Sequence, residues 1–197
     1  MKKYIVPALL SVLVLVGCSE MDYDLQQSVF IEDPVYPGLP EYSEWGYNTF
    51  GVYIDRKPFI SNHRDLPAKI IVNVDTLNLQ LTGTMEGERI TMKFSFIGYP
   101  IPDYGGLTAL NDQTFDLTSD QCIVSMTRNE HTERLNVFEG TFVVKSVQNL
   151  VIDGELAKSI LSGRFNFKTF INKEPTALAN GRFDLGIGYD GFYNFRR

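Results

Sequence analysis

Apolar and polar residues alternate with a period of two over much of the chain after residue 46. In the clearest case, Leu77, Leu79 and Leu81 precede a turn at residues 85–88, and a second alternating run follows it. This period is typical of half-buried strands, and the glycine in so short a turn favours a hairpin. Turn residues separate further strand-like runs at residues 47–54, 68–74, 121–127 and 135–147.

The last third of the chain repeats a Gly-x-Phe pattern at residues 140–142, 163–165 and 181–183. In a strand, a glycine leaves room for an aromatic side chain of its neighbour. We therefore expect three neighbouring antiparallel strands that share one core face. Arg164 and Asp184 would then point to the outer face, where they can pair across the strands.

The remaining segments carry weaker signals. Residues 98–106 contain too many glycines and prolines for a regular element, and residues 128–134 are charged and predict a turn. Residues 155–161 are the one helical candidate, but they lead directly into a strand, so we expect a strand there. The pattern as a whole predicts an all-β fold, an antiparallel β-sandwich of roughly nine to eleven strands, with a barrel-like closure as the alternative.

The start of the chain predicts export and a lipid anchor. Two lysines precede an apolar run at residues 4–16, which is shorter than the ~20 residues that span a bilayer. The run ends in Leu15-Val16-Gly17-Cys18, which resembles the lipobox of bacterial lipoproteins. This resemblance implies cleavage before Cys18 and attachment of acyl chains such as palmitate to its thiol. An ordinary signal peptide or an N-terminal membrane helix is the alternative.

We expect three parts: a lipoprotein signal peptide at residues 1–17, the lipidated cysteine with an acidic tether at residues 18–45, and a β-sandwich-like domain at residues 46–197. From residue 19 to residue 45 the chain contains acidic residues but no Lys or Arg, and Pro34, Pro37 and Pro40 favour extended backbone. In the alternative, part of this segment, around residues 29–31, packs on the domain as an edge strand.

Charge and cysteine content limit the partners. The full chain has a net charge of −6, and loss of Lys2 and Lys3 with the signal peptide would lower it to −8. A protein this acidic is repelled by phosphate backbones, so we expect no nucleic-acid partner. Cys122 is the one cysteine after Cys18, so the mature domain has no pair of thiols for an internal disulfide, and we expect Cys122 to be buried.

The sequence shows no pattern typical of a catalytic or metal centre. His63 and His131 have no second His or Cys at metal-binding spacing, and no nucleophile elbow or phosphate-binding loop occurs. We therefore expect no cofactor, no metal site and no enzymatic activity. A hydrolase built from carboxylates distant in the sequence is the enzymatic alternative.

Four aromatic residues are candidate ligand contacts, because aromatic faces combine apolar area with a polar group. Trp45 and Tyr47 lie near the end of the tether, and Tyr99 and Tyr104 lie in the loop at residues 98–106. Alternatively, these side chains cover the ends of the sandwich.

Several features together resemble a group of small Bacteroidetes outer-membrane lipoproteins of unknown function. They are the lipobox, the acidic residues directly after it, a hairpin at residues 48–59 and the paired Gly-Arg-Phe strands. The resemblance implies a lipid-anchored β-sandwich-like domain in the outer membrane that faces the cell exterior. Asp75-Thr76-Leu77 also resembles the short O-glycosylation signal of such bacteria, which would place a glycan on Thr76.

From these observations we expect a non-enzymatic binding or adhesion module whose partners are the membrane and a glycan or protein ligand. The alternative is a structural or accessory subunit of an envelope assembly that faces the periplasm.

Overall fold

The structure is a computed structural model that describes residues 27–61 and 66–195. The predicted signal peptide and Cys18 lie outside the described residues. The fold is all-β, as predicted, and contains 12 strands, which exceeds the predicted count. The strands are β1 (Thr49–Ile54), β2 (Lys57–Ile60), β3 (Ala68–Asn73), β4 (Thr76–Met85), β5 (Glu88–Ile97), β6 (Thr114–Asp116), β7 (Cys122–Arg128), β8 (His131–Arg134), β9 (Glu139–Ile152), β10 (Glu155–Ile171), β11 (Glu174–Ile187) and β12 (Phe192–Phe195).

The strands form one sheet in the order β6-β9-β10-β11-β1-β2-β4-β5-β7-β8, with β3 paired to β4 and β12 paired to β3. The link between β2 and β4 is a single residue pair, Ile60 with Thr84. At this point a Cβ atom on Gly83 would lie 2.2 Å from the carbonyl oxygen of Ile60, so only glycine permits the close crossing.

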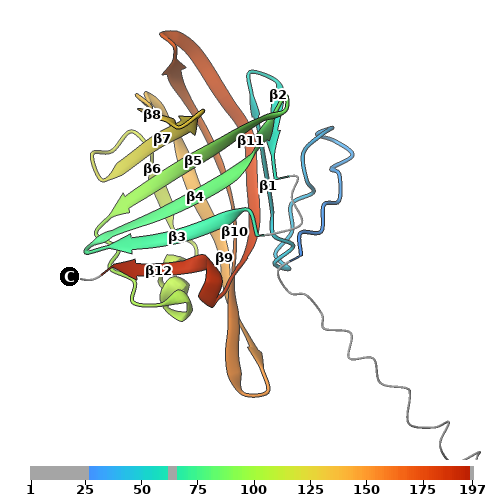
Figure 1. Ribbon diagram of the computed structural model, residues 1–197, viewed down its shortest axis with the longest axis vertical. Helices are drawn as coiled ribbons and strands as arrows, with labels where there is room; N and C mark the ends of the chain where they lie inside the picture. The colour runs from blue at the N-terminus through green and yellow to red at the C-terminus, as the bar shows by residue number, and fades with distance from the viewer. Residues whose placement is uncertain (1–26, 62–65, 196–197) are drawn as a thin grey trace, which may run out of the picture.

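The sheet folds over at this crossing into two layers that cross steeply (Figure 1). Strands β6, β9, β10, β11, β1 and β2 form one layer, and β4, β5, β7 and β8 form the other with β3 and β12. The two ends of the strand order, β6 and β8, do not pair with each other. The predicted sandwich-like arrangement is therefore confirmed, and the barrel-like closure is wrong.

The Gly-x-Phe pattern has the predicted role. Strands β9, β10 and β11 are antiparallel neighbours. A Cβ atom on Gly163 would lie 2.5 Å from the Phe183 ring, and one on Gly181 would lie 2.7 Å from the Phe165 ring. Each glycine thus makes room for the phenylalanine paired with it on the adjacent strand, which lets the large rings pack on one face.

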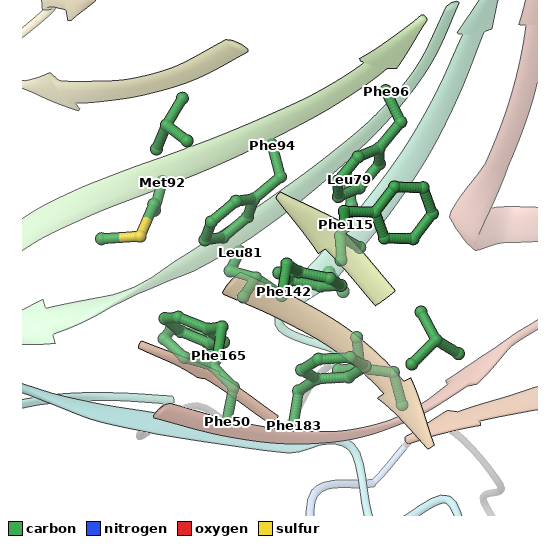
Figure 2. Close-up of a cluster of buried hydrophobic side chains, with 14 of the residues drawn as sticks. Phe50, Leu79, Leu81, Met92, Phe94, Phe96, Phe115, Phe142, Phe165 and Phe183 are labelled. Carbon is green, nitrogen blue, oxygen red and sulfur yellow. The ribbon is translucent and has the colours of Figure 1, made fainter. Parts of the chain in front are cut away.

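Phe142 of β9 lies at the centre of the core between the two layers (Figure 2). Its ring centroid is 4.8 Å from that of Phe94, 5.0 Å from Phe183 and 5.2 Å from Phe96. Aromatic pairs at these distances contribute roughly 0.5–1.5 kcal/mol each beyond the burial of their area. The core therefore holds the two layers in a fixed arrangement and provides a rigid support for the outer faces.

Three segments test the weaker predictions. Residues 155–161 begin β10, so the preference for a strand over a helix is confirmed. Residues 128–134 do not form one turn, because only Asn129 and Glu130 turn the chain, both with positive φ, and β8 then returns along β7. The loop at residues 98–106 ends in a short 3-10 helix, η1 (Tyr104–Leu110).

Candidate binding site

The N-terminal segment from residue 27 to residue 48 packs against the outer face of β10 and β11. Its Leu39 is fully buried, and Glu32 pairs with Pro40 so that the segment doubles back on itself. The free tether predicted over residues 18–45 therefore does not extend through residues 27–45. Packing on the domain was the alternative, and it occurs as a loop rather than as an edge strand.

A buried carboxylate on β11 holds this segment in place. Asp184 is 1 % exposed and accepts hydrogen bonds on both oxygens. The donors are the hydroxyl groups of Ser43 and Ser162 (2.9 Å) and the backbone N–H groups of Trp45 (3.2 Å), Gly46 (2.8 Å) and Tyr47 (3.1 Å). These donors satisfy the charge without a cation, so the predicted pair between Arg164 and Asp184 does not form.

The second buried contact is an ion pair between Arg182 of β11 and Asp33 of the segment. The Arg182 guanidinium also stacks on Tyr36, with its central carbon 4.6 Å from the ring centroid. Burial acts to raise the pKa of Asp33, but hydrogen bonds from Val35 N–H, from Arg182 and from Tyr36 N–H outweigh it and lower that pKa. Arg182 is thus neutralised within the protein.

Arg164 of β10 has a different environment. Its guanidinium carbon lies 4.6 Å from the centroid of the Tyr42 ring, and its side chain is exposed. The Tyr42 hydroxyl donates to Glu44 at 2.8 Å, and burial, together with that carboxylate, raises the pKa of Tyr42. The ring is therefore a fixed, neutral platform. Within residues 27–61 and 66–195 no carboxylate forms an ion pair with Arg164.

A groove of about 380 Å³ runs between Arg164 and Arg182 on this outer face. It lies at a β-bulge, where the register shifts between Phe165 and Phe167 and the extra residue Asn180 has a φ of 57°. Its lining residues are Arg164, Phe165, Asn166, Ala179, Asn180, Gly181 and Arg182.

Two exposed asparagines, Asn166 and Asn180, supply the groove with amide groups. Neither side-chain amide has a hydrogen-bond partner in the described part of the chain. We name this site the Arg164 groove. The Arg164 guanidinium has no described ion pair, and these two amides have no described hydrogen bond, so all three groups can bind a ligand.

The four predicted aromatic residues lie in different environments. Trp45 is 76 % exposed, and Tyr47 is half-buried. Tyr99 packs on the Phe115 ring at 5.2 Å, and the Tyr104 hydroxyl donates to the carbonyl of Leu156 at 2.9 Å. Tyr99 and Tyr104 therefore cover the core, which was the alternative, and Trp45 is the member of the set with a freely accessible ring.

Two further predicted residues lie away from the groove. Thr76 begins β4 after a turn, is half-buried, and donates its hydroxyl to Asp75 Oδ1 at 2.9 Å. Its glycosylation stays a prediction. Cys122 is buried, as expected, and burial raises the pKa of its thiol.

The sequence interpretation missed the Arg164 groove. The signal was the repeated Gly-Arg-Phe at residues 163–165 and 181–183, which places an arginine on the outer face of each strand. Read locally, the two arginines are equivalent. Only the docked N-terminal segment makes them different, because it buries Arg182 and leaves Arg164 exposed.

A larger cavity of about 420 Å³ lies between β3, the β10–β11 pair and the short 3-10 helix η2 (Tyr189–Gly191). Its lining contains three glycines, among them Gly188, small apolar side chains and four polar side chains, those of Lys69, Lys158, Tyr189 and Asp190. Lys69 lies over the Tyr193 ring, and Lys158 and Asp190 also interact within the protein, so these charged groups are engaged and the Arg164 groove is the stronger candidate.

Within the described residues, no group of three His, Cys, Asp or Glu side chains is placed to hold a metal ion. No helix in the described ranges is long and apolar enough to cross a membrane. No protein-family model, curated protein or solved structure matches the chain.

Proposed function

We propose that this is a lipid-anchored protein of the bacterial outer membrane that presents a non-enzymatic binding domain to the cell exterior. The observation that carries the proposal is the Arg164 groove. An exposed guanidinium stacked on Tyr42 lies beside the amides of Asn166 and Asn180, and all three are mounted on a rigid sheet. The stack on Tyr42 restrains Arg164, so this side chain loses less entropy on binding, which favours a ligand that can pair with it.

The same geometry favours binding over hydrolysis. Acid–base catalysis needs a carboxylate or another titratable group that can reach the ligand. The carboxylate of Asp33 is paired with Arg182, and that of Asp184 accepts from five donors, so neither is available to act on a bound molecule. The carboxylate of Glu44 accepts from the Tyr42 hydroxyl.

The lipid anchor fits the position of the docked segment. Nine peptide steps separate Cys18 from Gln27, the first described residue, and a fully extended chain of that length spans at most about 32 Å. If Cys18 is lipidated, the domain is confined to a shell close to the bilayer. This is a closer tethering than a free linker of residues 18–45 would give.

Two experiments test this proposal. Metabolic labelling with an alkyne fatty acid should mark the wild-type protein and not the Cys18→Ser variant. Protease added to intact cells should remove a C-terminal tag. Absence of label would refute the anchor, and a tag that survives until the outer membrane is broken would refute the outward orientation.

The binding claim needs its own measurement. Wild-type protein, the Arg164→Gln variant and the Arg89→Gln variant are compared on arrays of glycans and extracellular proteins. Arg89 is an exposed arginine on β5 with no described ion pair, so it is a matched control for charge. We expect ligands that bind wild-type and Arg89→Gln but not Arg164→Gln. If no ligand shows that pattern, the groove is not the binding site.

A structural subunit that faces the periplasm is the second candidate, because the strand order ends at two edges, β6 and β8. An uncovered edge can accept a strand from a partner. All four residues of β8 are exposed and polar, however, which is how natural sheets discourage such pairing. Crosslinks from β8 to another envelope protein would favour this candidate.

A further inference from the structure

We infer that the ligand of the Arg164 groove is an acidic oligosaccharide, and that Arg164 binds its carboxylate. This inference rests on the proposed function and names the class of ligand. Its basis is the combination of one uncompensated cation with two amides in a single groove.

The charge balance around the groove points to one anionic group. Two cations near Arg164 are paired within the protein. Lys168 pairs with Glu139 at 2.9 Å, and Arg182 pairs with Asp33. Arg164 has no such partner among the described residues, although the chain carries an excess of acidic residues. Two acids lie near Arg164 without pairing with it. Asp184 is saturated by internal donors, and Glu44 accepts from the Tyr42 hydroxyl and forms no described ion pair with Arg164.

The geometry of Arg164 suits a carboxylate. The Tyr42 ring covers one face of the guanidinium, which limits its rotation and leaves the N–H groups at its edge accessible. A planar fork of this kind binds carboxylate with two parallel hydrogen bonds. A lysine in the same place would provide charge but not this directionality.

The rest of the groove suits sugar hydroxyl groups. The Asn166 and Asn180 amides each offer donors and an acceptor, as hydroxyl groups require. Asn180 is the extra residue of the bulge, and its φ of 57° takes it out of the regular pleat of β11. The volume of about 380 Å³ is within the lower part of the roughly 300–1,000 Å³ typical of small-ligand sites, so it would hold a short part of a chain.

The test compares one oligosaccharide in two forms. Protein purified from cells that express the complete sequence is titrated with oligogalacturonate and with the same oligosaccharide after methyl esterification of its carboxylates. We expect binding of the acidic form that weakens with salt, and at least about tenfold weaker binding of the ester.

Matched variants locate the contact. Arg164→Gln should weaken binding of the acidic form roughly 10- to 100-fold, the range expected for a charged hydrogen-bonded contact. Arg164→Lys should recover only part of the loss, and Arg89→Gln should bind as wild type. Asn180→Gly removes the amide without backbone strain, because glycine adopts a φ of 57° readily, and should weaken both forms equally. Equal urea midpoints would show that each variant is folded.

The outcomes separate the ligand class from the proposed function. If wild type binds neither form, or both forms equally with no effect of Arg164→Gln, the acidic class is refuted. If the arrays then find a neutral glycan or a protein whose binding needs Asn180 or Arg164, the proposed binding function stands and only the acidic ligand class is wrong. If no ligand depends on the groove, both are refuted.

Discussion

Asp184→Asn is the substitution that most directly tests how the N-terminal segment is held. The change preserves the shape of the side chain but replaces one acceptor oxygen by an NH₂ group. Asp184 Oδ1 accepts from Gly46 N–H, and Oδ2 accepts from the N–H groups of Trp45 and Tyr47. Whichever oxygen is replaced, at least one buried backbone N–H therefore faces a donor instead of an acceptor.

The cost follows from those contacts. A buried donor without a partner costs about 1–3 kcal/mol, and the remaining bonds weaken because their acceptor is no longer charged. The serine hydroxyls can rotate to accept from the new NH₂ group, which offsets part of the loss. We expect Asp184→Asn to destabilise the docked state by about 2–4 kcal/mol, a large fraction of the ~5–15 kcal/mol typical of whole domains.

Amide hydrogen exchange measures this effect at the affected residues. If the segment opens locally, the Gly46 and Tyr47 amides should exchange roughly 30- to 1,000-fold faster, since each 1.4 kcal/mol is a factor of ten. Amides of β5 in the core should change far less. The matched control is Asp116→Asn, because Asp116 is exposed and bonds only locally, to Thr118. A change of less than about threefold at Gly46 and Tyr47 would show that Asp184 does not hold the segment.

The remaining predictions concern stability measured by urea unfolding. Asp33→Asn should cost roughly 3 kcal/mol at neutral pH, because it leaves Arg182 buried without its counter-charge. The folded-state pKa of Asp33 is below its unfolded value of about 3.9, so its contribution is complete above roughly pH 5 and is lost as the pH falls through the folded-state pKa. Asp33→Asn should remove that acid dependence, and an unchanged profile would contradict the assignment. Gly163→Ala should cost about 3 kcal/mol, since its Cβ atom would lie 2.1 Å from a carbonyl oxygen of β9, whereas Gly87→Ala, in open space at a φ of +85°, should cost only about 1 kcal/mol. Phe142→Ala should cost about 3–5 kcal/mol, and a cost under 1 kcal/mol would place Phe142 outside the core.

Local patterns in the sequence predicted the long strands. The hairpin is a short-range signal, and the Gly-x-Phe pattern is repeated along the chain. The alternation at residues 77–97 is the β4–β5 hairpin, and Gly163 and Gly181 mark the paired strands β10 and β11. The strands that the prediction missed or assigned to turns, such as β6 and β8, have three or four residues, too few for a period to show.

For the N-terminal segment at residues 27–48, the sequence indicates partial packing on the domain only as the alternative to a free tether. Its acidic, proline-rich composition is that of a linker. The residues that bind it, Arg182 and Asp184, lie at the other end of the domain sequence, and only the folded chain brings them together. For the same reason, two identical Gly-Arg-Phe motifs gave no indication that Arg164 would stay exposed and Arg182 would be buried.

The central claim is that ligand binds in the Arg164 groove, and the most direct measurement is an amide NMR titration with any ligand that the array retains. The account predicts that the side-chain amides of Asn166 and Asn180 shift most, together with backbone amides at the bulge, while the cavity at Gly188 stays unchanged. Shifts concentrated at Gly188 and Tyr189, with Asn166 and Asn180 unmoved, would place the binding site in the other cavity and contradict the account.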